Sequence, residues 1–226
     1  PGGGLSFRAP PSGGAGGPAG PRAPRPAHRH GHGHGYGHGY GHTHGHRYGG
    51  SDELGYSPEE RERGLVLMRA LDRDELVADA AAALSAARAE AGGRGVAFLG
   101  LSMGGHIAMR AATELSFELA VVFYPGWLLN SGFPLVGPVP PLESGDRIAA
   151  GGAFVPGFRG GLDHIVPAEE WEQAEQRLTR AAVPHELVTY PGARHGFACS
   201  DRPADYDPQA GADAWRKAYA ALATHL

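Results

Sequence analysis

A nearly unbroken apolar segment at residues 95–101 (GVAFLGL) leads directly into a Gly-rich turn and a helical pattern over 104–115. A short apolar run of this kind is typical of a strand buried on both faces, as the strands of parallel sheets are. The same reasoning predicts further strands at 119–124, 153–158 and 186–190. Strands that alternate with helices form a mostly parallel sheet with helices on both faces, so we expect the α/β class.

The predicted helices carry start and stop signals. Residues 57–60 (SPEE) combine an N-cap Ser, Pro at the first helical position and Glu at the third, which predicts a helix toward Leu71. Asp72 repeats the cap for a second helix, which Gly92 ends. The remaining assignments are a long loop at 127–150, a helix at 167–182, and a final helix from Asp207 with an apolar stripe of Trp215, Ala218, Tyr219, Leu222 and Leu226.

Composition divides the chain near residue 50. Residues 1–50 hold 17 of the 37 Gly, 7 of the 19 Pro and 8 of the 13 His, and Leu5 and Phe7 are their only large aliphatic or Phe residues. Such a segment buries too little apolar surface to offset the entropy lost on ordering. We therefore expect a disordered, low-complexity segment at 1–50 and one folded domain at 51–226.

Histidine alternates with Gly and Tyr over residues 28–46. Neutral imidazoles bind Zn, Ni or Cu, but nothing in this tract fixes a coordination geometry. A solvated tail is the favoured interpretation. The alternative is that this His-rich tract binds a divalent metal. We predict no metal site in the folded domain.

Charge and apolar runs exclude several classes of partner. Residues 51–226 carry 15 basic and 24 acidic residues, a net charge of −9, which repels the phosphates of nucleic acids. No apolar run reaches the roughly 18 residues that a membrane-spanning helix needs. Cys199 is the only cysteine, so no intrachain disulfide can form. With no pattern typical of a secretory signal, we expect a cytoplasmic protein.

Residues 100–104 (GLSMG) match the G-x-S-x-G pattern of a nucleophile elbow. The pattern often arises by chance, so its context must distinguish a real elbow from a chance match. Here a buried strand ends at Leu101 and a helix follows Ser102, as an elbow requires. That turn lifts the Ser102 oxygen above the sheet edge and points the Met103 N–H toward the same place. The alternative is that Ser102 only caps the helix.

An alcohol needs a neighbouring base to act as a nucleophile at neutral pH. His195 lies in a loop just past the last predicted strand, at the sheet edge where open α/β sheets bind their ligands. His106 is expected to point along its helix, and His185 and His225 are expected at the surface. We therefore favour His195 as the base.

A carboxylate that orients the imidazole completes such a site. Asp163 follows the strand at 153–158 and precedes a helix, which also places it at the carboxyl edge of the sheet. Its alternative role is a helix cap. The order Ser102, Asp163, His195 is the order of α/β-hydrolases.

Four segments carry a resemblance to a known family: 98–105 (FLGLSMGG), 123–126 (FYPG), 161–167 (GLDHIVP) and 190–197 (YPGARHGF). From about Arg47 to Leu226 the sequence resembles the dienelactone hydrolase family of the α/β-hydrolase superfamily. The resemblance implies a cofactor-free serine hydrolase of small-molecule esters or lactones. It also implies that Ser102, Asp163 and His195 form the triad of an acyl-enzyme mechanism, with Met103 in the oxyanion hole.

Two departures from the family pattern matter. The best-known members carry Cys where this chain has Ser102, which resembles the esterase-type branch. Members also begin with further strands, which flank the nucleophile strand and supply the second oxyanion amide. Residues 1–50 cannot form such strands, so we expect a sheet without them and an apolar edge near 96–101. We also expect 1–50 to be an incomplete or misread N-terminus joined to a genuine hydrolase part.

Three aromatic residues are predicted to wall an apolar substrate pocket: Tyr124, Trp127 and Phe133. The alternative for each is core packing or the ordering of its loop. The alternative function is that of a catalytically impaired hydrolase-like fragment whose His-rich tract at 28–46 binds a divalent metal. A peptidase of the same superfamily would need a larger specificity domain than this length holds. The sequence specifies neither the particular ester or lactone nor the oligomeric state.

Overall fold

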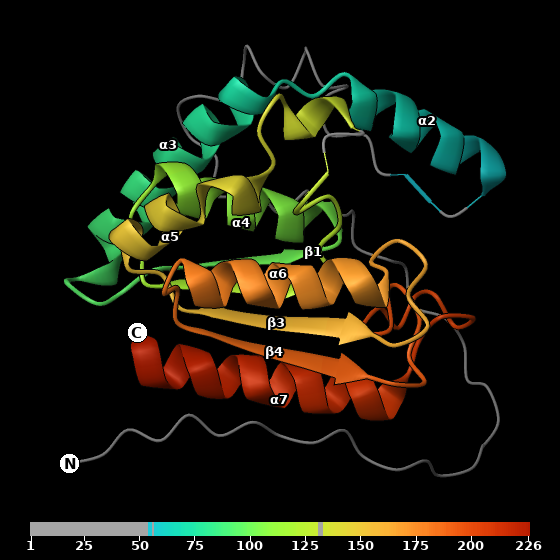
Figure 1. Cartoon of the computed structure of the whole chain (residues 1–226). Coiled ribbons are helices and arrows are strands. Elements are labelled where there is room, and N and C mark those ends of the chain that lie inside the picture. Colours follow the sequence, from blue (N-terminus) through green and yellow to red (C-terminus); the bar gives the residue numbers. More distant parts are fainter. Residues whose placement is uncertain (1–53, 56, 131–132) are drawn as a thin grey trace, which may run out of the picture. The chain divides into compact units, whose positions relative to one another are not determined.

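Four parallel strands form the sheet of the computed structural model (Figure 1). The structure describes residues 54–55, 57–130 and 133–226. The segment 1–50 lies outside these residues, and the predicted division of the chain near residue 50 stays a prediction. In spatial order the strands are β1 (Ala97–Leu101), β2 (Leu119–Phe123), β3 (Val155–Gly160) and β4 (His185–Tyr190).

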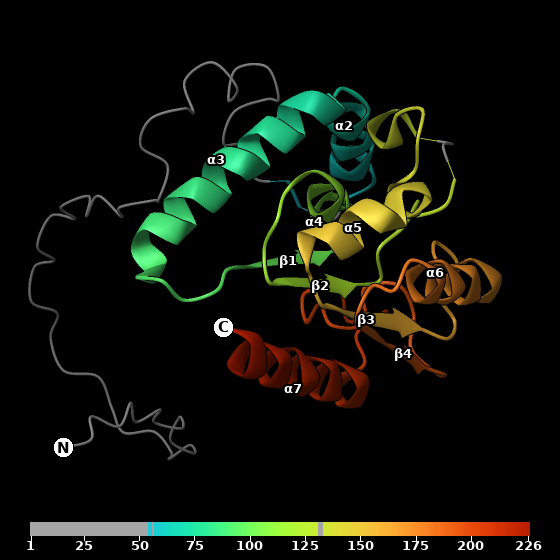
Figure 2. The same cartoon turned by 60° about the vertical axis from the view of Figure 1, so that its left-hand side comes forward.

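Helices cover both faces of this sheet, as predicted for the α/β class (Figure 2). Alternate residues of β2 point to opposite faces: Val121 and Phe123 pack toward α7, and Ala120 and Val122 pack toward the other helices. None of the described helices combines the length and apolar character needed to cross a membrane. The described helices are α2 (Pro58–Arg69), α3 (Arg73–Ala91), α4 (Met103–Glu114), α5 (Gly145–Gly151), α6 (Ala168–Arg180) and α7 (Pro208–His225), with 3₁₀ turns η1 (Pro134–Val136) and η2 (Pro141–Ser144).

Local capping signals predicted the starts of three helices correctly. Ser57 and Glu60 form a capping box, in which the Glu60 N–H donates to Ser57 Oγ (3.2 Å) and the Ser57 N–H to Glu60 Oε2 (3.3 Å). Asp72 accepts from two first-turn N–H groups of α3, and Gly92 ends that helix at φ 62°. Asp207 caps α7 in the same way as Asp72 caps α3.

The long loop predicted at 127–150 is wrong, because this segment contains η1, η2 and α5. Its prolines start short helical turns: Pro134 and Pro141 each occupy a first helical position. Leu135, Leu142 and Ile148 are buried and anchor these turns on the domain. The helical character therefore comes from tertiary packing, which proline-based loop signals do not report.

Strand β3 begins two residues later than predicted and contains Pro156, although it is paired on both sides. Its pairing with β2 is interrupted: an isolated bridge joins Leu119 to Phe154, and regular pairing resumes at Val122 with Gly157. Proline has no N–H to donate to the ladder, which accounts for the gap at this position.

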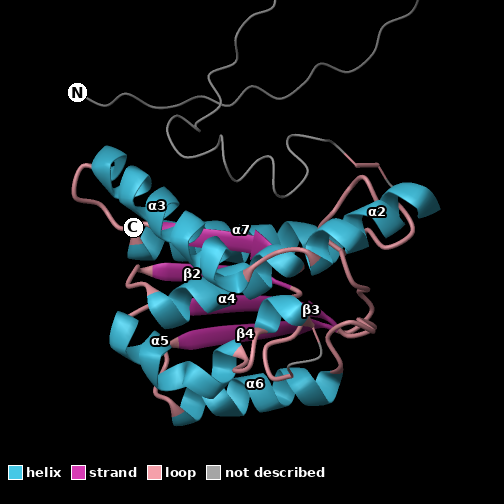
Figure 3. Cartoon of the chain, turned by 90° about the horizontal axis from the view of Figure 1, so that it is seen from above, coloured by secondary structure: helices cyan, strands magenta, loops and turns pink. Residues whose placement is uncertain are grey.

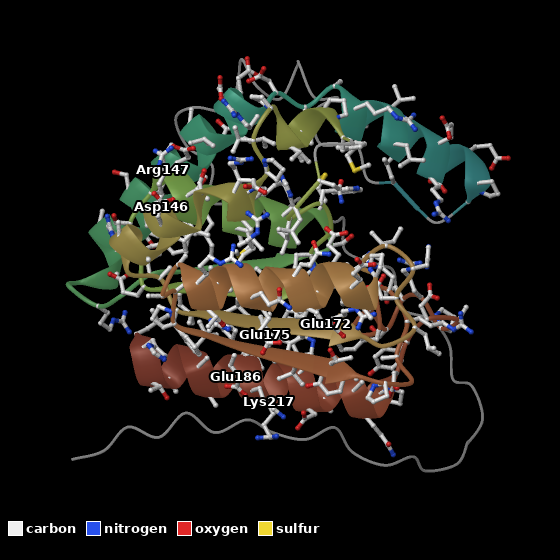
Figure 4. The ribbon with its side chains drawn as sticks, in the orientation of Figure 1. Asp146, Arg147, Glu172, Glu175, Glu186 and Lys217 are labelled. Atoms are coloured by element: carbon white, nitrogen blue, oxygen red, sulfur yellow. The ribbon has the colours of Figure 1, made fainter. Side chains whose placement is uncertain are left out.

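Helix α7 buries most of its predicted apolar stripe. Ala218 is buried together with Ala210 and Ala214, and Trp215 and Leu222 pack against the same cluster. Tyr219 and Leu226, also placed on the stripe, are 63% and 39% exposed. Figure 3 shows α4 over the strands between α3 and α5, and α4 is buried on nearly all sides. Helix α6 is clearly amphipathic: it buries Trp171, Ala174 and Leu178 and exposes Glu172 and Glu175, labelled in Figure 4.

Strand β1 is an edge of the sheet in the described part of the chain, as expected for a sheet without preceding strands. Toward β2, Val96 O accepts from Glu118 N and Ser102 N donates to Phe123 O. Because backbone direction alternates along a parallel strand, residues 97, 99 and 101 turn their N–H and C=O groups outward. The Leu99 side chain is 40% exposed on this edge.

Candidate active site

Ser102 occupies the turn between β1 and α4 in a strained backbone conformation, at φ 54° and ψ −117°. Its N–H donates to Phe123 O (2.9 Å), and its side chain makes no capping bond to α4. Ser102 Oγ instead lies 2.9 Å from His195 Nε2. The turn is tight enough that a Cβ at Gly100 would lie 2.0 Å from Gly104 O, so only glycine fits there.

His195 connects Ser102 to Asp163. His195 Nδ1 lies 2.9 Å from Asp163 Oδ2, and the two residues are 8% and 4% exposed. The other carboxylate oxygen, Oδ1, accepts from Ile165 N (2.8 Å) and Val166 N (3.0 Å). The residue that precedes α6 is Pro167, so Asp163 is not the cap of that helix. The two carboxylate oxygens of Asp163 thus have separate roles: Oδ1 holds its loop and Oδ2 faces the imidazole.

These contacts assign the protons. A carboxylate accepts only, so Nδ1 of His195 carries a proton and donates it to Asp163. In the neutral ring Nε2 is then an acceptor that faces the Ser102 hydroxyl. The arrangement can therefore remove the hydroxyl proton as Ser102 forms a bond to carbon. Met103 is the first residue of α4, where helical N–H groups have no acceptor within the helix.

Arg159 of β3 supports the Asp163 loop and was not identified from the sequence. It is 4% exposed, and its guanidinium donates from Nε to Val166 O (2.6 Å) and from Nη2 to Gly161 O (3.4 Å). These two carbonyls lie on either side of Asp163 in the chain. A charged residue within an otherwise apolar strand was the available signal.

The three predicted pocket residues differ in burial and in the rings that they contact. Tyr124 is 2% exposed, has φ 40°, and packs its ring 5.0 Å from the His195 ring. Burial raises the pKa of Tyr124 well above its usual range, so it remains a neutral phenol. Trp127 and Phe133 are half-buried and stack on each other at 4.8 Å. Their role as pocket walls stays a prediction.

The other histidines of the folded part make separate contacts. His106 is buried, and its Nδ1 lies 3.2 Å from Gly126 O. His164 is exposed, with its ring 6.5 Å from that of His195. His225 is exposed as predicted, whereas His185 is half-buried at the start of β4.

Within the described ranges no group of three or more His, Cys, Asp or Glu residues is arranged to hold a metal ion. The His-rich tract at 28–46 lies outside those ranges, so its metal-binding alternative is untested.

Comparisons with known proteins show the family of the chain. The model of the family described as "Dienelactone hydrolase family" matches residues 39–226. A protein from Synechocystis sp. named as a candidate carboxymethylenebutenolidase is 32% identical over 179 residues, which cover 77% of this chain and 69% of that protein. One of the same name from Saccharolobus solfataricus is 28% identical, over 68% of this chain and 53% of that protein.

Solved structures show the same fold. A candidate dienelactone hydrolase from Klebsiella pneumoniae superposes with a TM-score of 0.58 at 28% identity, over 66% of this chain and 60% of that one. A dienelactone hydrolase-like promiscuous phosphotriesterase from metagenomic libraries gives 0.55 at 22% identity, over 75% and 69%. The chain thus spans about two thirds or less of the length of most of these proteins. With the family model covering most of its residues, the chain belongs to the dienelactone hydrolase family of α/β-hydrolases.

Proposed function

We propose that this chain is a serine hydrolase that cleaves carboxylic esters or lactones through an acyl-enzyme. The supporting observation is the unbroken hydrogen-bonded series from Ser102 Oγ through His195 to Asp163, with both contacts at 2.9 Å. The relatives named as candidate carboxymethylenebutenolidases, a name that denotes a lactone substrate, favour this substrate class.

In the first half-reaction Ser102 Oγ bonds to the carbonyl carbon of the substrate, and its proton moves to His195 Nε2. The Asp163 carboxylate stabilises the imidazolium through Nδ1–H. The carbonyl oxygen becomes an oxyanion, to which Met103 N–H donates. When this intermediate collapses, the bond to the leaving oxygen breaks and His195 Nε2 protonates that oxygen. For a lactone the leaving oxygen stays tethered to the acyl group.

The second half-reaction repeats these steps with water. His195 Nε2 takes a proton from water as the water oxygen bonds to the acyl carbon, and then returns that proton to Ser102 Oγ as the acyl–oxygen bond breaks. The products are the carboxylic acid and the restored Ser102 hydroxyl. The acyl chain would lie against Trp127 and Phe133, while Tyr124 holds one side of the His195 ring.

A fluorophosphonate probe tests the proposal on the full chain, because it forms a stable adduct with an activated serine. We expect labelling at Ser102, together with hydrolysis of para-nitrophenyl acetate and of a butenolide. Ser102→Ala should abolish labelling and lower kcat by at least about 10⁴-fold. Ser85→Ala, at an exposed position on α3, is the matched control. Folded protein that leaves Ser102 unlabelled would contradict the proposed function.

A further inference from the structure

His106 of α4 has two ring nitrogens in different situations, and the residue is 1% exposed. Nδ1 lies 3.2 Å from Gly126 O, and a carbonyl only accepts, so Nδ1 carries the proton. Burial, followed by the charge of Arg110, lowers the pKa of His106 to about 4, which keeps the ring neutral at pH 7. Nε2 is then a bare acceptor, and it has no partner among the described residues.

Arg110 lies one helical turn after His106, on the same face of α4. It is 5% exposed, and its Nη2 donates to Val136 O (2.8 Å) and Val139 O (2.5 Å). Its Nε–H is a buried donor that no described residue accepts. An unsatisfied acceptor and an unsatisfied donor therefore occur one turn apart.

Both side chains line one cavity between α3, α4 and η1. The centre of a water molecule can occupy about 10 Å³ inside the cavity. This is room for one water. The rest of its wall comes from Arg73 and from apolar residues: Leu76, Val77, Ala80, Ile107, Ala111 and Leu135.

His106 and Arg110 each carry a buried atom without a partner among the described residues, and an occupant that bonds to both atoms must match their chemistry. It must donate a hydrogen bond to an imidazole nitrogen and accept one from a guanidinium. A halide accepts but cannot donate, and it would face the Nε2 lone pair. A cation is disfavoured because two positively charged residues, Arg73 and Arg110, line the cavity. We propose that this cavity binds one ordered water, which accepts from Arg110 Nε–H and donates to His106 Nε2.

The bound water has a consequence for the catalytic rim, and this step rests on the proposed function. By donating to Nε2, the water keeps the His106 proton on Nδ1, where it holds the Gly126 carbonyl. Gly126 lies between Tyr124 and Trp127, which both have positive φ values, and the Tyr124 ring packs on His195. His106 is thus a positioning residue for one wall around the catalytic imidazole.

The water site is tested without substrate. A high-resolution crystal structure of the full chain at neutral pH should show one water within hydrogen-bond distance of His106 Nε2 and Arg110 Nε. Nitrogen NMR of the imidazoles should show a protonated Nδ1 and an unprotonated Nε2 at His106. A halide in the cavity, an empty cavity or a protonated Nε2 would each overturn the site. None of these readouts depends on whether Ser102 is a nucleophile.

Two substitutions separate positioning from packing. In His106→Asn the amide NH₂ takes the place of Nδ1–H and keeps the donor to Gly126 O. In His106→Gln the polar group reaches the cavity but leaves Gly126 O without its donor. We expect His106→Asn to retain kcat within about threefold and His106→Gln to lose at least about tenfold, with a slower fluorophosphonate reaction at Ser102. Equal effects on kcat in two folded variants would reject the positioning role of His106. The water site is decided separately, by the crystal structure.

Discussion

Gly160 and Ala193 touch through their backbones: a Cβ at Gly160 would lie 2.4 Å from Ala193 O. This contact joins the end of β3 to the loop that follows β4, and those two segments carry Asp163 and His195. The 2.9 Å distance between the carboxylate and the imidazole therefore depends on a position that has no side chain.

The first prediction concerns this contact. Gly160→Ala forces the two loops apart, so we expect kcat to fall by about 100-fold, since a displacement near 1 Å has effects of that size. Gly192→Ala is the control, because a Cβ at this position of the same loop meets nothing within 4 Å. Steady-state kinetics with an ester substrate make the comparison. Equal activity of the two variants would show that the loop contact does not set the site.

Asp163→Asn tests the carboxylate. The amide retains the shape of the side chain but neither stabilises an imidazolium nor holds the Nδ1–H tautomer reliably, so kcat should fall by roughly 10⁴-fold. The exposed Asp201→Asn is the charge-matched control. An Asp163→Asn enzyme with near-normal kcat, measured by burst and steady-state kinetics, would remove Asp163 from the mechanism.

Arg159→Met removes the donors that hold Val166 O and Gly161 O while keeping the length of the side chain. We expect kcat to fall more than KM changes, because the Asp163 loop loosens while the substrate contacts remain. Arg159→Lys should recover only part of the activity, since one ammonium does not reproduce the planar donor geometry. Full recovery by Lys would indicate that only the charge matters.

His106 predicts a pH dependence of stability. Its pKa is about 4 in the folded protein against 6.5 as the ordinary value, so the unfolded chain binds the proton first as pH falls. The stabilisation is complete above pH 6.5 and is lost as pH falls toward about 4, with a total of about 3 kcal/mol. The charge of Arg110, which lines the same cavity, is the second cause of this lowered pKa, after burial.

Urea unfolding measured across this pH range checks the prediction. His106→Asn should flatten the dependence of the unfolding free energy on pH, whereas the exposed His164→Asn should leave its slope unchanged. Parallel curves for wild type and His106→Asn would show that this imidazole does not titrate between the two pH limits.

Strand β1 has no neighbour on its outer side within residues 57–130 and 133–226, and this edge predicts self-association. Leu99→Lys places a charge beside the outward backbone groups, which blocks edge-to-edge pairing of strands. Light scattering of concentrated protein should show less association than in wild type. Val66→Lys changes an equally apolar residue, 56% exposed on α2, and should have a smaller effect. If both substitutions act equally, overall charge and not the strand edge is responsible.

The sequence predicted best what depends on neighbouring residues. The caps at Ser57, Asp72 and Asp207 are satisfied within their own turns, and the apolar run before Ser102 is a strand. The predicted strand ends also placed Ser102, Asp163 and His195 at one edge of a parallel sheet. Their contacts follow from that topology, and their catalytic roles remain proposals.

Features that depend on distant residues were missed. Helix α5 forms where prolines suggested a loop, because the buried Ile148 anchors it to the domain. Arg159 and Arg110 are charged residues in buried positions, and each is stabilised there by backbone carbonyls from a different segment. The sequence shows these arginines in apolar surroundings, but not the distant carbonyl groups to which they donate.

The strand that leads to Ser102 has a hydrogen-bonded neighbour on only one side among the described residues. Opening such a strand costs less free energy than unfolding the whole domain. When the temperature is raised moderately, catalytic activity should fall while the helical circular dichroism signal persists. The backbone amides of residues 97–101 should be among the first in the sheet to exchange with deuterium. The temperature at which the enzyme loses activity would then be set by the local opening of this one edge strand.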